Sequence, residues 1–547
     1  MEASFDFIVV GGGTAGCLLA NRLSSNPATR VLLLEAGGKD DYLWIHIPVG
    51  YLYCIGNSRT DWLYHTEAVA GLGGRSIRYP RGKVLGGCSS INGMIYMRGQ
   101  ALDYQGWVEA GNSGWGWDDV LPYFLRHESY YKRDDGSTDP LHGADGEWRV
   151  EKSRVRWQIL DAFQEAAAQA GIPPTEDFNR GDNFGCGYFE VNQRSGVRWN
   201  TSKAFLRPVL SRPNLLVLTK AQVTRLVFSE SGPLRVVGVE FVQGGERAVI
   251  QTAQCLREVV LAAGAIHSPA LLQHSGIGSS ARLSDAGIGQ RLDLPGVGAN
   301  LQDHLQLRMV YKVSGVRTLN AEAHLWWRRG LMGLQYGLFR NGPLSMSPSQ
   351  LGVFARSADD VASPDLEYHV QPLSLDKFGE PLHRFPAFTA SVCHLRPTSR
   401  GVVEVTSGDV FAAPRIAPNY LSTEYDLSVA VRAIELTRRI VGGSALSRYA
   451  PIEYLPGADV GSAAELRAAA AQIGTTIFHP VGTCKMGLAS DRSAVVDGRL
   501  RCLGMSGLRI ADASVMPTIT SGNTNSPTLM IAERAAEFIL ADARQAS

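Results

Sequence analysis

Residues 5–16 read FDFIVVGGGTAG, an apolar run that leads directly into a glycine-rich turn. A helical pattern continues through Leu23, and residues 31–35 (VLLLE) are typical of a second buried strand. A strand, a glycine turn, a helix and a strand within about 30 residues form the βαβ unit that binds a dinucleotide. This stretch therefore predicts an α/β fold with a Rossmann-like domain.

Three glycines in this turn have the spacing GxGxxG. Gly11 allows the tight turn, Gly13 lets the backbone approach a pyrophosphate, and Gly16 packs the helix against the strand. The phosphates would lie at the helix N-terminus. Glu35 follows about 20 residues later, where a carboxylate binds the ribose hydroxyls. An acid at this position disfavours NADP, but the fingerprint alone leaves NAD and FAD open.

Length and composition exclude several classes of protein. A chain of 547 residues is too long for one ordinary core, so two or more domains are expected. The net charge of +1 argues against a nucleic-acid partner, and no run of about 18 apolar residues predicts a transmembrane helix. The chain enters a strand by Phe5, which leaves no room for a signal peptide, and its eight cysteines are scattered. We expect a cytoplasmic protein without a metal site.

The sequence pattern changes between about residues 310 and 470. Residues 366–373 and 387–395 form alternating or mixed strands that suit an antiparallel sheet with one face towards a site. Glycine-rich turns with buried strands return after Ile473. The predicted nucleotide domain is therefore discontinuous and comprises residues 1–155, 191–310 and 472–547. The predicted substrate domain, with an antiparallel or mixed sheet and helices, comprises residues 156–190 and 311–471.

A second glycine-rich segment, residues 81–93, reads RGKVLGGCSSING. Such bare backbone can lie against a flat ring system, while Ser89, Ser90 and Asn92 can reach its polar edge. A purely structural Ω-loop is the alternative, and this segment alone does not decide between the two.

The C-terminal part carries residues suited to alcohol chemistry. His479 can act as a base near pH 7, and the amide of Asn523 can hold the oxygen from which the proton is taken. Ser526 as N-cap and Pro527 as the first helical residue predict a helix start, whose positive end favours an anion. The alternatives are a histidine and an asparagine that serve local turns.

Together these motifs resemble those of the glucose–methanol–choline (GMC) oxidoreductase family. Residues 81–93 resemble its first signature, residues 264–278 its second, and the segments around His479 and Asn523 its catalytic end. The resemblance extends from Phe5 to Ile539 and is greatest for the bacterial branch similar to choline, L-sorbose and aliphatic alcohol dehydrogenases. It implies FAD, two domains and oxidation of an alcohol to a carbonyl.

The resemblance also implies roles for single residues. His479 corresponds to the catalytic base, and Asn523 to its partner, which is His or Asn in the family. The helix from Pro527 would point at the flavin, Asp512 would contact its ribityl–phosphate part, and the backbone of Val223 would meet the adenine. The predicted FAD contacts are Gly11, Gly13, Thr14, Ala15, Gly16, Glu35, Ala36, Val84, Gly87, Ser89, Asn92, Gly93, Ile95, Val223, Asp512, Ala513, Thr524, Pro527 and Thr528.

One departure from the family concerns covalent attachment of the cofactor. Some choline oxidases attach FAD through a histidine that follows the Gly-Gly-x-Ser-Ser run. Ile91 occupies that position here and cannot form such a bond. We therefore expect non-covalent FAD.

The substrate side is less determined. His369 and Gln371 share one face of a predicted strand, so either could line a pocket or simply satisfy a buried sheet. Residues 325–340 are basic, aromatic and amphipathic. They could form a lid or contact a membrane surface. A helix that packs on the core with solvated arginines is the favoured interpretation.

The combined prediction is an FAD-dependent oxidoreductase that oxidises a primary alcohol or polyol, with the proton going to His479 and hydride to the flavin. Oxygen or a quinone or other electron carrier would reoxidise the cofactor. Two alternatives remain, namely an FAD-containing lyase similar to hydroxynitrile lyases and a non-catalytic flavoprotein.

Overall fold

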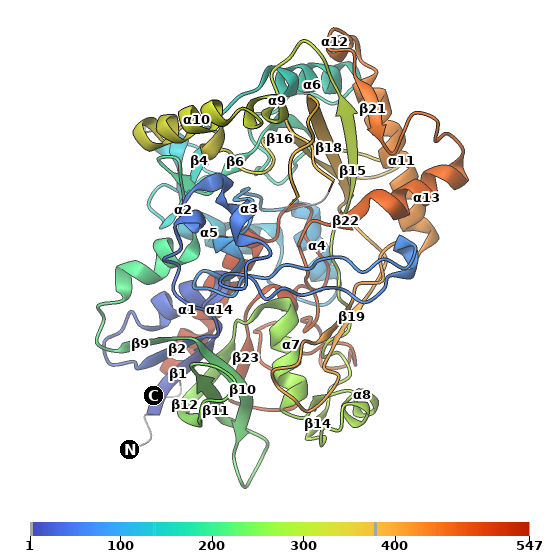
Figure 1. The fold of residues 1–547 in the computed structure, drawn as a ribbon. Helices are drawn as coiled ribbons and strands as arrows, with labels where there is room; N and C mark the ends of the chain where they lie inside the picture. Colours follow the sequence, from blue (N-terminus) through green and yellow to red (C-terminus); the bar gives the residue numbers. More distant parts are fainter. Residues whose placement is uncertain (1–3, 135, 137, 377–379, 546–547) are drawn as a thin grey trace.

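A computed structural model describes residues 4–134, 136, 138–376 and 380–545. Within this part the chain forms two seven-stranded sheets (Figure 1). One lies in the lower half of Figure 1 and contains both β1 and β23, which are far apart in sequence. The other lies in the upper half. The predicted α/β fold class, with one mostly parallel sheet and one antiparallel sheet, is therefore confirmed.

The first sheet has the order β10-β11-β12-β1-β2-β9, with β23 paired to β12. The pairs that join β23, β12, β1, β2 and β9 are parallel, and β10 and β11 extend the sheet in antiparallel fashion. The bounds are β1 Ser4–Val10, β2 Val31–Glu35, β9 Leu215–Thr219, β10 Ala221–Phe228, β11 Val236–Gln243, β12 Ile250–Leu261 and β23 Leu508–Ile510.

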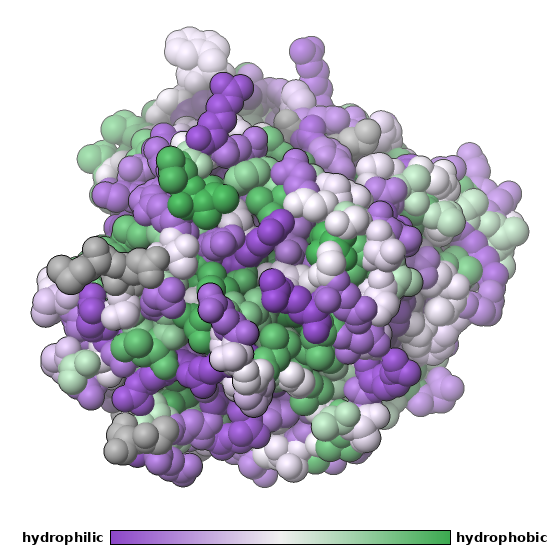
Figure 2. Space-filling model, turned by 90° about the horizontal axis from the view of Figure 1, so that it is seen from below, coloured by the Kyte–Doolittle hydropathy of each residue, from purple (hydrophilic) through white to green (hydrophobic). Residues whose placement is uncertain are grey.

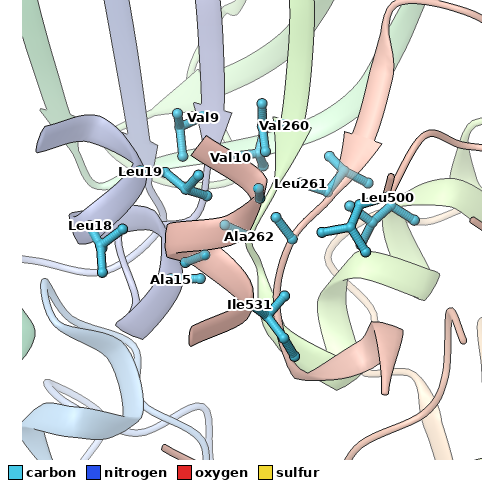
Figure 3. Packing of buried hydrophobic residues seen from close by; sticks show 14 of the residues in the cluster. Val9, Val10, Ala15, Leu18, Leu19, Val260, Leu261, Ala262, Leu500 and Ile531 are labelled. Atoms are coloured by element: carbon cyan, nitrogen blue, oxygen red, sulfur yellow. The ribbon is translucent and has the colours of Figure 1, made fainter. Parts of the chain in front are cut away.

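Two helices from opposite ends of the chain pack together on this sheet. They are α1 (Thr14–Leu23) and α14 (Asn525–Gln545). Figure 3 shows Leu19 of α1 and Ile531 of α14 in the same buried cluster as Val9 of β1. Each such buried aliphatic side chain contributes about 1.5–3 kcal/mol to stability. Burial of the sheet explains why its strands read as continuous apolar runs.

The second sheet has the order β21-β15-β18-β17-β16-β5, with β22 paired to β15. Every pairing between these strands is antiparallel. The bounds are β5 Gly185–Tyr188, β15 Leu305–Lys312, β16 Leu351–Ala355, β17 Leu366–Gln371, β18 Ala387–His394, β21 Ile452–Leu455 and β22 Gly474–Thr476.

The two faces of the second sheet differ in chemistry. His369, Ser391 and Arg308 are paired across β17, β18 and β15, so their side chains share one face. Gln371 and Thr389 form the next row on that face. The alternate residues are apolar and pack in a cluster with α6 (Gln158–Gln169) and α11 (Glu424–Val441). The polar face is therefore available for a site, while the apolar face supports it.

The other elements surround these sheets. The further helices are α2 Leu43–His46, α3 Tyr51–Cys54, α4 Ala101–Glu109, α5 Trp117–His127, α7 Gly264–His274, α8 Ser280–Asp285, α9 Leu319–Ala323, α10 Trp326–Phe339, α12 Ser444–Ser447 and α13 Ala463–Ile473. The further strands are β3 Glu128–Tyr130, β4 Trp148–Lys152, β6 Glu190–Val191, β7 Gln193–Arg194, β8 Val197–Arg198, β13 Ile277–Gly278, β14 Leu292–Asp293, β19 Val402–Glu404 and β20 Arg415–Ala417.

Two expectations from the sequence need correction. Helix α14 begins at Asn525, so Ser526 lies in its first turn and is not the N-cap. The helix within residues 325–340 is not packed on the core, because only Met332 and Tyr336 of α10 are buried.

The domain boundaries remain a prediction. Strand β15 crosses residue 310, yet it pairs only within the second sheet.

The surface and the helices show how the described part of the protein could relate to a membrane. Figure 2 shows the molecule from below, where hydrophilic residues are spread over the face and apolar ones lie among them. Among the described residues, no helix has the length and apolar character needed to cross a membrane.

Candidate active site

The dinucleotide turn follows β1 and has little room for side chains. Gly11 has a φ of 101°, and a Cβ on Gly16 would lie 1.8 Å from the carbonyl oxygen of Gly11. Oε2 of Glu35 accepts the N–H of Gly12 at 2.7 Å, and Oε1 accepts that of Gly37 at 2.7 Å. Burial raises the pKa of Glu35 to about 7, although these two bonds act against it. The carboxylate is thereby fixed at the end of β2.

The glycine-rich segment 81–93 lies against this turn. Gly86 and Gly87 have φ values of 85° and 51°, and a Cβ on Gly87 would lie 2.7 Å from Cα of Gly13. No larger residue allows this approach of the two backbones. The segment is therefore part of the wall around the dinucleotide turn, a role that its composition alone left open against that of a structural Ω-loop.

The N-termini of α1 and α14 meet at the same place. The hydroxyl of Thr14 donates to Oδ1 of Asn525 at 2.9 Å, across almost the whole length of the chain. Each helix directs its free backbone N–H groups and the positive end of its dipole towards this point. The arrangement suits an anionic group or a ring that acquires negative charge.

Asp512 connects the C-terminal strand of the first sheet to helix α7. Its Oδ2 accepts the hydroxyl of Ser268 at 2.6 Å and the N–H of Gly264 at 2.8 Å, and its Oδ1 accepts the N–H of Ser514 at 2.8 Å. The second signature, residues 264–278, is thereby held against the end of β23.

A buried carboxylate holds the segment that carries His479. Asp303 accepts the backbone N–H of His479 on Oδ1 at 2.7 Å. Its Oδ2 accepts hydroxyl groups from Thr476, Tyr79 and Tyr420. Four donors on one carboxylate fix the backbone turn that precedes the imidazole.

The imidazole itself lies in a row of hydrogen bonds. Nδ1 of His479 is 3.1 Å from Nδ1 of His304, and Nε2 of His304 is 3.1 Å from the carbonyl oxygen of Leu395. On the other side, Nδ2 of Asn523 is 3.0 Å from Nε2 of His479. The two residues predicted to be catalytic are thus in direct contact.

This row determines the tautomers. A carbonyl oxygen only accepts, so Nε2 of His304 carries hydrogen and its Nδ1 has a lone pair. Nδ1 of His479 must then be the donor, which leaves the lone pair on Nε2. Burial lowers the pKa of His479 well below its ordinary value and lowers that of His304 to about 4. Both rings are therefore neutral at pH 7, and the lone pair on Nε2 of His479 accepts the amide N–H of Asn523.

Sequence reasoning missed His304 and Asp303. They are adjacent in the chain, but they act on a residue that follows about 170 positions later. No spacing rule links such distant positions. The available signal was an Asp-His pair directly before a strand in a chain with a predicted catalytic histidine.

Comparisons with known proteins identify the family of the chain. The profile described as GMC oxidoreductase matches residues 5–306 with its N-terminal part and residues 397–532 with its C-terminal part. The chain belongs to the GMC oxidoreductase family. The resemblance seen in the sequence is therefore confirmed, and the protein is an FAD-dependent oxidoreductase that acts on CH–OH groups.

Relatives of this GMC protein match over nearly their full length. An alcohol dehydrogenase [acceptor] of Pseudomonas putida is 38% identical, with 99% of this chain and 97% of the relative covered. An oxygen-dependent choline dehydrogenase of Photobacterium profundum is 39% identical, with 99% of this chain and 94% of the relative covered.

Solved structures also match. Pyridoxine 4-oxidase from Mesorbium loti has a TM-score of 0.85 at 34% identity, with 98% of this chain and 99% of that chain covered. A formate oxidase has a TM-score of 0.91 at 26% identity, with 100% of each chain covered.

The GMC fold gathers most of the predicted cofactor positions around one cavity. Those that line it are Gly11, Gly13, Thr14, Ala15, Glu35, Ala36, Gly87, Asn92, Gly93, Ile95, Val223, Asp512, Ala513, Thr524 and Thr528. The other predicted positions lie behind this wall: Gly16, Val84, Ser89 and Pro527. Gly16 packs under the turn, and the hydroxyl of Ser89 donates to the carbonyl of Gly86.

The far end of the cavity is formed by the polar face of the second sheet. His369 and Gln371 both line it, together with His479 and Asn523. Gln306 lines the same end, although the sequence did not indicate it.

Carboxylates line this cavity only near the nucleotide turn. Among the described lining residues they are Glu35 and Asp512. The end at the second sheet instead presents amide, hydroxyl and imidazole groups and no carboxylate among the described lining residues. The Nε2 of Gln371 donates to the hydroxyl of Ser349 at 3.0 Å, which orders these side chains relative to each other.

Proposed function

We propose that this GMC oxidoreductase oxidises a neutral primary alcohol or polyol, with His479 as the base and Asn523 as the group that holds the oxygen. The row of hydrogen bonds from Leu395 through His304 and His479 to Asn523 carries the proposal. It leaves a lone pair on Nε2 of His479 and an amide donor beside it, which is what an alcohol O–H needs.

The proposed reaction begins with the substrate hydroxyl at Nε2 of His479, next to the Asn523 amide. As the C–H bond breaks, the hydroxyl proton moves to Nε2, and the amide N–H holds the oxygen in place. The Nδ1–H of the resulting imidazolium keeps its bond to the lone pair of His304, which stabilises the charge. Bound FAD supplies the two-electron acceptor for the hydride.

The residues present fit FAD held without a covalent bond. Ile91 lines the cavity and has no nucleophilic atom. Glu35 would bind the ribose of FAD, and the glycine turn would bind its pyrophosphate. The two helix N-termini would face the pyrophosphate and the flavin ring. We expect acid precipitation to release all flavin into the supernatant, and flavin retained by the precipitate would refute non-covalent binding.

The neutral end of the cavity supports the substrate class. A fixed quaternary ammonium group, such as that of choline, would meet no carboxylate among the described residues that line this end. Gln306, Gln371 and Ser349 offer hydrogen bonds that suit additional hydroxyl groups. We therefore favour neutral primary alcohols and polyols over the cationic alcohol choline.

Anaerobic mixing of the holoenzyme with a panel of alcohols tests the activity. We expect primary alcohols or polyols to bleach the visible absorbance of the flavin and choline to do so at least tenfold more slowly. Failure of the whole panel would overturn the proposal. Turnover with oxygen compared with a quinone or dye would then identify the acceptor, and fractionation of cells would test the expected cytoplasmic location.

A further inference from the structure

Helix α10 presents its apolar side chains to solvent. The exposed fractions are 84% for Trp326, 65% for Leu338, 65% for Phe339, 59% for Leu334, 55% for Leu331 and 47% for Trp327. The helix lies at the edge of the upper half of the molecule in Figure 1, next to α9. A contiguous exposed apolar surface of this kind marks an interaction site in a folded protein.

The orientation of α10 is opposite to that of an ordinary surface helix. Met332 and Tyr336, four positions apart, mark the face towards the protein. Trp327, Leu331, Leu334 and Leu338 follow each other at spacings of four, three and four, so they form one stripe. Because a helix turns 100° per residue, this stripe lies on the side away from the buried pair. The apolar stripe is therefore the outermost part of the helix.

Arginines surround the helix, mostly on the side away from the stripe. Arg328 lies at one edge of the stripe, with its Nη1 3.8 Å from Oε1 of Glu322, whereas Arg329 and Arg340 lie on the protein-facing side. Residues 325–342 contain no Asp or Glu, and the hydroxyl of Tyr336 donates to the carbonyl of Gly196 at 3.0 Å, which brings the hairpin with exposed Arg194 beside the helix. The region around the stripe therefore carries more arginines than carboxylates.

We propose that the exposed stripe of α10 docks on an anionic lipid surface. Trp, Leu and Phe side chains can enter the boundary between headgroups and acyl chains, while the arginines contact lipid phosphates. A second copy of the chain fits less well, because it would bring the same arginines against each other. The helix lies on the membrane in this arrangement and does not cross it.

The position of α10 connects this surface to the cavity. The chain leaves α10 through the short helix Pro343–Ser345 and reaches Pro348 and Ser349, which line the cavity. This short helix also contacts Pro48–Gly50, directly before cavity-lining Tyr51. If the proposed function holds, docking places the substrate end near the bilayer, where a lipid-soluble quinone can accept electrons from the flavin.

Vesicle binding by the holoenzyme tests the proposal. Wild-type protein should co-sediment with vesicles that contain phosphatidylglycerol and should bind pure phosphatidylcholine at least tenfold more weakly. The double variant Trp327→Ser/Leu334→Ser should lose at least tenfold in partition. The matched control is Leu216→Ser/Leu256→Ser, which removes two apolar side chains that are 44% and 61% exposed on the first sheet. This control should bind as the wild type does.

Charge-removing variants distinguish binding to an anionic lipid surface from binding to another protein. Arg328→Gln/Arg329→Gln should weaken binding to anionic vesicles by about fivefold per arginine, since each contributes about 1 kcal/mol near such a surface. High salt should also weaken binding to anionic vesicles. Reduction of the flavin by a soluble alcohol should stay unchanged in every variant, which keeps this test independent of the proposed reaction.

Two results would overturn the proposal. One is equal partition of the wild type and the Trp327→Ser/Leu334→Ser variant on anionic vesicles. The other is a wild-type dimer in light scattering that becomes a monomer in this variant while vesicle binding is absent, which would assign the stripe to a second copy of the chain.

Discussion

The two seven-stranded sheets meet the reactants in different ways. The first sheet presents backbone: its glycine turn approaches the cofactor site because side chains are missing there. The second sheet presents side chains: amide, hydroxyl and imidazole groups on alternate residues of its strands face the cavity. Under the proposed function, FAD is bound mainly by main-chain geometry, and the substrate by side chains that can be exchanged without altering the backbone. The difference predicts which changes the fold tolerates.

The largest effect is expected in the first sheet. Gly16→Ala places a Cβ within 1.8 Å of the carbonyl oxygen of Gly11, so the turn cannot form. We expect loss of bound FAD and a decrease in unfolding free energy of roughly 3 kcal/mol or more. Flavin content and thermal unfolding measure this. Gly106→Ala in α4, where a Cβ meets nothing within 4 Å, should keep FAD and full stability. Normal flavin content in Gly16→Ala would contradict the conclusion that the first sheet binds the cofactor through closely approaching backbone.

The second prediction concerns chemistry without loss of fold. His479→Ala should retain FAD, because the cofactor positions on the first sheet are unaffected. The rate of flavin reduction by substrate should fall by about 10²–10⁴-fold, the scale of general base catalysis. Stopped-flow absorbance measures the rate. Exposed His65 provides the control His65→Ala, which should reduce at the wild-type rate. An unchanged rate in His479→Ala would mean that the base lies elsewhere.

The third prediction addresses the support of the base by the second sheet. His304→Ala removes the acceptor of the His479 Nδ1–H bond. We expect kcat to fall roughly tenfold to a hundredfold, as for residues that orient a functional imidazole, with little change in KM. His304→Asn keeps an acceptor oxygen and should recover part of kcat. If both variants lose the same activity, His304 serves packing only.

The smallest effect on the reaction is expected beside the separate three-stranded sheet β3–β4–β6, whose first strand begins with Glu128. His142 is 3.2 Å from Glu128 and 3.0 Å from Asp177. Burial alone would lower its pKa, but the bonds to Asp177 and Glu128 outweigh burial and raise the pKa to about 9. The folded-state pKa lies above the unfolded value of about 6.5, so this contribution is complete below pH 6.5 and disappears as pH rises through 9.

Urea unfolding between pH 6 and pH 10 measures this term. We expect the wild type to lose roughly 3 kcal/mol more than His142→Gln over that interval, the linkage equivalent of a pKa that rises from about 6.5 to about 9. Parallel pH curves for the two proteins would show that His142 carries no linked proton.

The sequence predicted the first sheet better than the second for a physical reason. The cofactor turn is local, since Gly11, Gly16 and Glu35 act within one βαβ unit. The His304–His479 contact depends on how β15 and the segment after β22 pair, which no local pattern encodes.

Helix α10 shows a different limit. Its amphipathic pattern was read correctly as a helix with an apolar side, but a pattern does not state which side faces the protein. Tertiary packing places Met332 and Tyr336 inwards and leaves the wider apolar stripe outside. The prediction of a core-packed helix was wrong because core and interface produce the same periodicity.

The contact between α1 and α14 has a consequence for biosynthesis. The bond from Thr14 to Asn525 and the ion pair from Arg22 to Glu533 join segments separated by 511 positions. While the ribosome is still translating the middle of the chain, the emerged βαβ unit lacks the helix that covers it. Its apolar surface must be shielded for that time, and flavin cannot be retained until α14 has emerged. The cofactor is therefore expected to bind late, after the C-terminal helix has been synthesised.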